Sequence, residues 1–296
     1  MSRFTNDSSS VGRLFAASVI AALVFALPGS AALAAPPAEA RTLVVMDPLA
    51  KPLSCPCVQG YAQRDYELLA ARLERDLKRP VTIVFNESLQ AALDGDAKGR
   101  ADIVVGKHSV VLYDAARAKL ALTPILALSN KGGGTTMTGL VVVPTADPAQ
   151  SISELNGVRL VFGPAECDEK HTAALALFKQ NGVTPPATLE TAVACDEGAL
   201  KILDDAKQGR RGAAVISSYA QPLLEGCGTV AKGALRVVGE TTPVPFIEVY
   251  VRSELPQAER DQIAAVLKKS TTDPQLRIAL ETRDGFVPIP ADLKKK

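Results

Sequence analysis

The stretch Lys131-Gly132-Gly133-Gly134 separates two parts of the chain that show the same alternation of structural patterns. In both parts, short apolar runs typical of buried strands alternate with amphipathic segments typical of helices. The first part predicts strands and helices in the order 42–46, 62–78, 81–85, 89–94, 102–105, 110–119 and 123–128. The second part predicts them in the order 139–143, 151–155, 159–162, 169–180, 189–194, 197–207, 213–217, 237–240, 245–251 and 258–269.

This repeated alternation predicts the class of fold. Strands that alternate with helices form parallel sheets with right-handed crossovers. Because the series occurs twice, we expect two α/β lobes that form a clamshell around a ligand cleft, rather than one doubly wound sheet. The glycine run lacks the Lys-Ser/Thr that follows in a phosphate-binding loop, so it is predicted to be a hinge.

The N-terminal segment has the composition of an export signal. Arg3 and Arg13 mark a positively charged head, residues 14–27 are predominantly apolar, and Ala32-Leu33-Ala34 supplies small residues for cleavage. The apolar run is shorter than the ~20 residues that span a bilayer, so a cleaved signal peptide at residues 1–34 is favoured over a retained membrane helix. The mature protein is therefore expected in the periplasm.

The composition argues against several classes of function. A net charge of +1 speaks against nucleic acid as a partner, because phosphates are bound by clustered basic residues. Aromatic residues make up 4% of the chain and tryptophan is absent, which argues against a stacking platform for bases. The sequence contains no nucleophile elbow, metalloprotease pair or dinucleotide fingerprint, so we expect neither an enzyme nor a cofactor.

Several sequence strings, in their order and spacing, resemble the phosphonate-binding branch of the periplasmic solute-binding proteins. They are Asn130-Lys131-Gly132-Gly133, then Ser151 followed by Glu154-Leu155-x-Gly157-x-Arg159-Leu160-Val161-Phe162-Gly163-Pro164, and finally Arg252-Ser253-x-Leu255-Pro256 and Gly285-Phe286-Val287-Pro288. Ala101-Asp102-Ile103-Val104-Val105-Gly106 is similar to the strand-to-pocket turn of that family. The likeness extends over residues 41–290.

This resemblance implies the two-lobed fold of type II, transferrin-like periplasmic binding proteins. Lobe 1 would combine residues 41–135 with 246–296, and lobe 2 would span residues 140–240. The family implies a small-molecule or ion ligand, such as a phosphonate- or phosphate-like oxyanion, and an ABC transporter permease as partner. We expect a monomer that meets the membrane only through that transporter.

The segments expected at the pocket depart from the family pattern. In the family, the helix after the Phe-Gly-x-Pro-like turn begins with Ser/Thr hydroxyls and free backbone N–H groups that hold phosphonate. Here the matching stretch is Ala165-Glu166-Cys167-Asp168-Glu169-Lys170-His171, in which Asp168 is the expected helix N-cap. Carboxylates in place of hydroxyls predict weaker binding of a doubly charged oxyanion than in the relatives.

The candidate ligand-binding residues lie where predicted strands end and helices begin on the cleft side. Lys51, Arg64 and Lys107 could supply positive charge to an anion, although solvated surface positions are the common alternative for such residues. His108 and His171 are the only histidines. The candidate ligand-binding set is Lys107, His108, Ser109, Cys167, Asp168, His171, Ser217 and Tyr219.

The five cysteines all lie after the signal peptide, in a compartment that favours disulfides. Cys167 and Cys195 end neighbouring strands of lobe 2, so a disulfide between them is expected, with two reactive thiols as the alternative. Cys55 and Cys57 could join the histidines in a copper or zinc site, which makes metal binding the alternative function and thiol-redox chemistry a third. Cys227 is expected to be a buried structural thiol.

Overall fold

A computed structural model describes residues 39–55, 58–60, 62–270 and 272–291. The predicted signal peptide and Cys57 lie outside these residues. No helix of the described segments is long and apolar enough to cross a bilayer.

The first sheet has six strands in the order β13-β4-β12-β3-β1-β2. Its strands are β1 (Arg41–Met46), β2 (Val81–Phe85), β3 (Ile103–Lys107), β4 (Leu122–Leu128), β12 (Ile247–Arg252) and β13 (Phe286–Val287). Alternate residues of β1 enter cores on opposite faces: Leu43 and Val45 pack in one cluster, Val44 and Met46 in the other. This sheet and its helices are called lobe 1 below.

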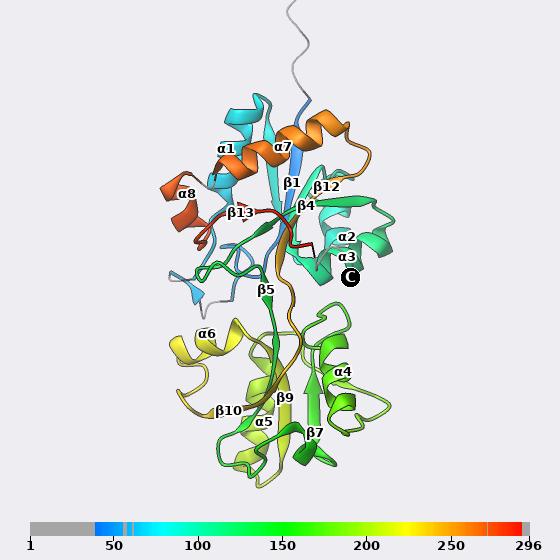
Figure 1. Ribbon diagram of the computed structural model, residues 1–296, viewed down its shortest axis with the longest axis vertical. Helices are drawn as coiled ribbons and strands as arrows, with labels where there is room; N and C mark the ends of the chain where they lie inside the picture. The colour runs from blue at the N-terminus through cyan, green and yellow to red at the C-terminus, as the bar shows by residue number, and fades with distance from the viewer. Residues whose placement is uncertain (1–38, 56–57, 61, 271, 292–296) are drawn as a thin grey trace, which may run out of the picture. The chain divides into compact units, whose positions relative to one another are not determined.

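Within the described residues, five α-helices cover this sheet. They are α1 (Tyr66–Leu77), α2 (Leu89–Asp94), α3 (His108–Ala118), α7 (Gln257–Ser270) and α8 (Pro274–Ala279). Helix α1 begins where the Asp65 carboxylate accepts a hydrogen bond from the backbone N–H of Glu67, as an N-cap does. It buries the predicted apolar face, Tyr66, Leu69, Leu73 and Leu77, against the sheet. Figure 1 shows α1 and α7 next to each other, and residues of both helices pack in the same apolar cluster.

The second sheet has five strands in the order β10-β6-β9-β7-β8, and with its helices it is called lobe 2. Its strands are β6 (Gly139–Pro144), β7 (Arg159–Phe162), β8 (Glu190–Thr191), β9 (Gly212–Ser217) and β10 (Leu235–Glu240). The helices of this lobe are a 3-10 turn (Ile152–Leu155), α4 (Thr172–Gln180), α5 (Glu197–Lys207) and α6 (Ala220–Gly226). The two apolar clusters on its faces are separate from those of lobe 1.

The chain passes between the sheets on two short strands, β5 (Thr136–Met137) and β11 (Val244–Pro245), which pair with each other in antiparallel fashion. Figure 1 shows β5 between the two sheets, which share no strand. The expected two-lobed α/β fold is therefore confirmed, whereas the lobe boundaries stated above stay a prediction. The glycine segment before β5 forms a turn in which Asn130 Oδ1 accepts hydrogen bonds from the N–H groups of Gly132 and Gly134.

The sheets are mixed, although the sequence pattern predicted parallel ones. Strand β12 returns from lobe 2 and enters the sheet at the end where β3 leaves it, so that Ile247 pairs with Lys107 and the two strands run antiparallel. In the same way β6 enters beside the end of β9, with Gly139 opposite Ser217. The chain direction at each crossing, which local periodicity does not encode, sets these orientations.

Several element boundaries also differ from the predictions. Helix α4 begins at Thr172, three residues after the predicted start, because residues 163–171 form consecutive hydrogen-bonded turns instead. Asp168 is consequently not the N-cap; His171 occupies that position. The strand predicted at 189–194 is reduced to the two residues of β8. Helix α8 was not predicted.

Candidate functional site

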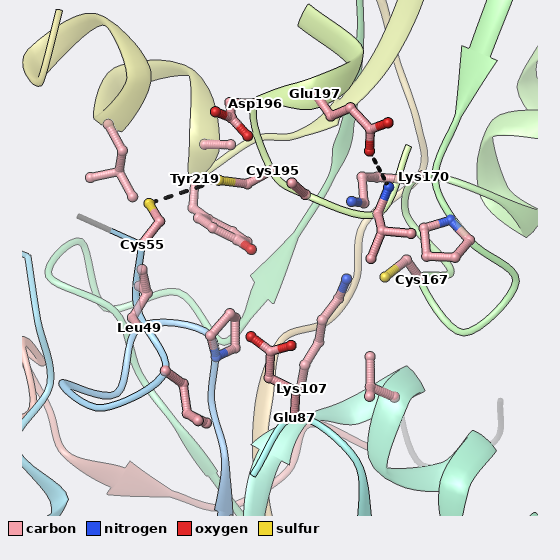
Figure 2. A pocket seen from close by; sticks show the side chains of 18 of the residues that line it. Leu49, Cys55, Glu87, Lys107, Cys167, Lys170, Cys195, Asp196, Glu197 and Tyr219 are labelled. Carbon is pink, nitrogen blue, oxygen red and sulfur yellow. Dashed lines mark hydrogen bonds between the residues drawn. The ribbon is translucent and has the colours of Figure 1, made fainter. Parts of the chain in front are cut away.

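A cavity of about 570 Å³ lies between the two lobes. Lobe 1 contributes Met46, Leu49, Cys55 and Lys107 to its wall, and lobe 2 contributes Cys167, Lys170, Cys195 and Tyr219, among other residues. Figure 2 shows the Lys107 side chain extending from lobe 1 into the space between Tyr219 and Cys167. The cavity is of the size that small-molecule sites have, about 300–1,000 Å³.

The polar centre of the site is an ion pair that joins the lobes. The Nζ of Lys107, at the end of β3, donates a hydrogen bond to Glu169 Oε1 at 2.7 Å. The hydroxyl of Ser217, at the end of β9, donates to the same oxygen at 2.6 Å. A single carboxylate of the chain thus accepts hydrogen bonds from the strand ends of both lobes.

The charges of this pair stabilise each other in a buried setting. Burial alone would raise the pKa of Glu169, but the Lys107 ammonium and the two hydrogen bonds lower it below its ordinary value. Burial would likewise lower the pKa of Lys107, yet the Glu169 carboxylate raises it instead. Both side chains are therefore charged at neutral pH.

Two glycines permit the close approach of the turn that carries Glu169. A Cβ at Gly139, in β6, would lie 1.9 Å from the carbonyl oxygen of Glu169. A Cβ at Gly163 would lie 2.4 Å from the Cβ of Lys170. Since real Cβ contacts are much longer than these, the turn can reach its position only because both residues lack a side chain.

A second buried ion pair supports the lobe 1 wall of the cavity. Asp47 follows β1 and is fully buried; its Oδ2 accepts hydrogen bonds from Arg64 Nη1 at 2.7 Å and from the Tyr66 hydroxyl at 2.5 Å. Its Oδ1 accepts from the backbone N–H of Leu49, which lines the cavity. Arg64 also lies over the ring of Phe246, 5.5 Å from its centroid. Arg64, a cationic candidate in the sequence, is thus paired with Asp47 inside lobe 1.

Three of the eight predicted ligand-binding residues line the cavity: Lys107, Cys167 and Tyr219. The Tyr219 ring stacks on Phe246, with centroids 5.2 Å apart and planes 19° apart. Lys51, considered as a cationic candidate, is paired with Asp65 at 2.6 Å and is not a lining residue.

The structure places the other five predicted residues around the cavity wall rather than on it. His108 Nδ1 lies 2.8 Å from Glu248 Oε2 and 2.7 Å from the Tyr250 hydroxyl, within lobe 1. The hydroxyl of Ser109 accepts a hydrogen bond from the backbone N–H of Asp168 across the lobes, at 3.3 Å. His171 Nδ1 lies 2.9 Å from the carbonyl oxygen of Gly163, and Ser217 is bound to Glu169. A ligand-binding role for the eight residues stays a prediction.

The cysteines are arranged differently from the sequence prediction. No disulfide joins any two of the four described cysteines, including the expected pair Cys167 and Cys195. The Sγ atoms of Cys195 and Cys55 instead lie 4.0 Å apart, because the loop after β1 brings Cys55 across the cleft to lobe 2 (Figure 2). Cys227 is exposed rather than buried, because it follows the last turn of α6 at the surface.

The metal-site interpretation finds no support in the described segments. No group of three or more His, Cys, Asp or Glu side chains within them is placed to hold a metal ion. His108 and His171, the proposed partners of Cys55, are engaged elsewhere by Glu248 and by the Gly163 carbonyl.

The acidic lining of the cavity was not part of the predicted ligand-binding set. Glu87 of lobe 1 and Glu166, Asp196 and Glu197 of lobe 2 line the cavity, together with the cation Lys170. Figure 2 shows Glu87, Asp196, Glu197 and Lys170 around it. Glu166 and Lys170 stand in the stretch that departs from the family pattern, so the signal for them was present there. The signal for Glu87 was not, because it lies in a loop without a recognisable motif.

A comparison with known protein families identifies the family of this chain. A family model described as "ABC transporter, phosphonate, periplasmic substrate-binding protein" matches residues 59–293. No curated protein matches the sequence significantly.

Solved structures show the same fold at low sequence identity. A Xanthomonas citri protein bound to ATP is similar with a TM-score of 0.64 and 17% identity, over 86% of this chain and 93% of that one. A binding protein component of a Pseudomonas aeruginosa ABC phosphonate transporter has a TM-score of 0.62 and 12% identity, over 86% and 82% of the two chains. PhnD1 from Prochlorococcus marinus, in complex with methylphosphonate, has a TM-score of 0.62 and 12% identity, over 86% and 94%.

Proposed function

Because the chain belongs to the family of phosphonate-type periplasmic substrate-binding proteins of ABC transporters, we propose that it captures a small solute between its lobes and delivers it to an importer permease. The observation that carries this proposal is the cavity lined by both lobes. Groups from two lobes around one ligand couple binding to closure, because full contact requires the lobes to come together. The family is a transport family rather than an enzyme family.

The finer features of this function are also proposals. Export through the signal peptide at residues 1–34 would place the protein in the periplasm as a monomer. Of the predicted binding residues, Lys107, Cys167 and Tyr219 would contact the solute, since they line the cavity. His108, Ser109, Asp168, His171 and Ser217 would hold these walls in place through the hydrogen bonds described above.

Replacing Tyr219 with alanine should weaken solute binding at least tenfold. The ring lines the cavity and stacks on Phe246, so its loss removes contact area and loosens the wall. The measurement is a thermal-shift screen of phosphate, methylphosphonate, amines and amino acids, followed by calorimetric titration of each hit into both proteins. Tyr113→Ala on the exposed face of α3 is the matched control and should bind as the wild type does. Equal affinity of the Tyr219 variant would place the solute elsewhere.

Oxidation should join Cys55 to Cys195 and lock the lobes together. Their sulfur atoms are 4.0 Å apart, about 2 Å beyond a disulfide bond length, so a small loop movement is sufficient. With oxidised glutathione, the two thiols would give up two electrons and two protons, and the oxidant would become two molecules of glutathione.

Peptide mapping under non-reducing conditions checks this pairing. The cross-linked peptide should disappear in Cys55→Ser and persist in both Cys57→Ser and Cys167→Ser. Persistence in Cys55→Ser would show that another cysteine is the partner of Cys195 and would contradict the prediction.

A further inference from the structure

The meeting point of the two lobes is already occupied by an anion of the chain itself. Lys107 and Ser217 stand at the ends of β3 and β9, the strand ends at which α/β proteins offer donors to ligands, and Lys107 lines the cavity. Both donate to Glu169 Oε1, at 2.7 Å and 2.6 Å. The single O–H of Ser217 is used by this bond, so a ligand oxyanion could take it only by displacing the carboxylate, and the positive charge of Lys107 is already neutralised.

This carboxylate is fixed in place. Glu169 has no exposed surface, and the turn that carries it is pressed against Gly139. Its second oxygen, Oε2, is buried and has no hydrogen-bond partner among the described residues. The Glu169 carboxylate is therefore held in place by the backbone turn and by the donors to Oε1 from both lobes. Moving Glu169 aside would leave the Lys107 ammonium buried without its counter-ion.

The rest of the cavity carries an unequal set of charges. Of the two lysines on its described wall, Lys107 is neutralised by Glu169, whereas Lys170 forms no ion pair within the described segments. Lys170 is only 7% exposed, and its stem packs over Gly163. The wall thus offers a solute one ammonium group.

Four carboxylates line the same cavity: Glu87, Glu166, Asp196 and Glu197. Glu197 is paired with Lys201 at 2.9 Å, while the other three form no ion pair within the described part of the chain. A solute with two negative charges on one group would face a single lysine and three carboxylates, which disfavours it. A solute with one negative and one positive group would find a partner for each.

From this arrangement we propose that Glu169 is a built-in anion that occupies the oxyanion donors, and that the cavity takes a small zwitterion, an ammonium carboxylate, in place of a phosphonate dianion. The inference rests on the proposed function, because it names the solute class of the same cavity. The solute carboxylate pairs with Lys170 and its ammonium group with the free carboxylates. Leu49, Leu53 and Leu223 provide an apolar surface for the body of the solute.

The first experiment is calorimetric titration of the wild-type protein with the standard L-amino acids and with methylphosphonate. At least one amino acid should bind, and methylphosphonate should bind at least tenfold more weakly than the best of them. The N-acetyl and the amide derivatives of that amino acid each lack one charge, and each should lose at least tenfold in affinity. Tighter binding of methylphosphonate than of every amino acid would overturn the zwitterion assignment, as would full affinity of either derivative.

The second experiment removes the built-in anion. Glu169→Ser frees Lys107 and leaves space for an oxyanion, so its affinity for methylphosphonate should rise at least tenfold over that of the wild type. Glu169→Gln keeps the side-chain volume and should gain less, and it replaces the serine variant if that one does not fold. Glu166→Gln removes one negative charge from the cavity wall without releasing Lys107, and its affinity for methylphosphonate should also rise less. Glu67→Gln, outside the cavity, should leave the affinity unchanged.

The outcomes separate this inference from the proposed function. If Glu169→Ser, or Glu169→Gln in its place, folds and gains no affinity for methylphosphonate, the role of Glu169 as a built-in anion is contradicted. If the wild type binds methylphosphonate best, the inference fails and the solute-binding function stands. If no solute of any class binds the wild type, the proposed function fails, while the gain in the Glu169 variants still decides the role of Glu169.

Discussion

Replacing Asp47 with alanine should lower the free energy of unfolding by about 3–5 kcal/mol, because it leaves the buried Arg64 charge without its counter-ion. Arg64 is 2% exposed, and its Nη1 donates to Asp47 at 2.7 Å. The Tyr66 hydroxyl loses its acceptor, Asp47 Oδ2, and the backbone N–H of Leu49 loses its acceptor, Asp47 Oδ1. Each hydrogen bond that these buried groups lose adds to the cost.

Urea denaturation followed by far-UV circular dichroism measures this loss. The matched control is Asp204→Ala, which breaks an exposed pair with Lys207 on α5 and should change stability by less than about 1 kcal/mol. A double replacement of Asp47 and Arg64 by leucine and methionine should recover part of the loss, since no unpaired charge remains. A loss for Asp47→Ala as small as that of the control would show that Arg64 reaches solvent or another anion.

The strands and helices of this fold could be predicted because their apolar residues form short buried runs or follow the helical period. The apolar run of β1, which is buried throughout, and the face of α1 with Leu69, Leu73 and Leu77 are examples that the structure confirms. The direction of β6 and β12 could not be predicted in this way. It depends on the chain crossing between lobes, which joins residues far apart in the sequence.

The site was only partly predictable for a related reason. The stretch after β7 was recognised as unusual, but its carboxylate role was expected at Asp168 as a helix cap. In the structure the helix begins later, and the turn places Glu169 at the donors of both lobes. Asp168 and Glu169 are adjacent acidic residues, and the local sequence does not show which of them interacts with Lys107. Only the three-dimensional position of Lys107 distinguishes them. The cysteine pair across the cleft was missed because strand adjacency within lobe 2 was the only guide.

Replacing Lys107 with methionine should lower the free energy of unfolding by about 3–5 kcal/mol at pH 7.5, because the variant buries the Glu169 carboxylate with Ser217 as its remaining donor. Methionine is close to lysine in length, so the cavity created is small and the effect is mainly electrostatic. The inter-lobe ion pair is lost, and the lobes should also separate more readily. Lys207→Met, at an exposed pair on α5, is the control and should cost less than about 1 kcal/mol.

The pH dependence of this loss identifies its cause. In the wild type the pKa of Glu169 is lowered, so its contribution to stability is present above the ordinary value of 4.5 and is lost as the pH falls through the folded-state pKa. Without Lys107, burial raises the pKa of Glu169, so the variant loses stability as the pH rises from 4.5 through that raised value. The difference in the free energy of unfolding between the two proteins should therefore be large at pH 7.5 and smaller at pH 4.5.

Lys107→Met combined with Glu169→Gln should be more stable at pH 7.5 than Lys107→Met alone, because no buried charge is left unpaired. An equal loss at both pH values, or no recovery in the double variant, would mean that Lys107 stabilises the lobes by packing and not by its charge.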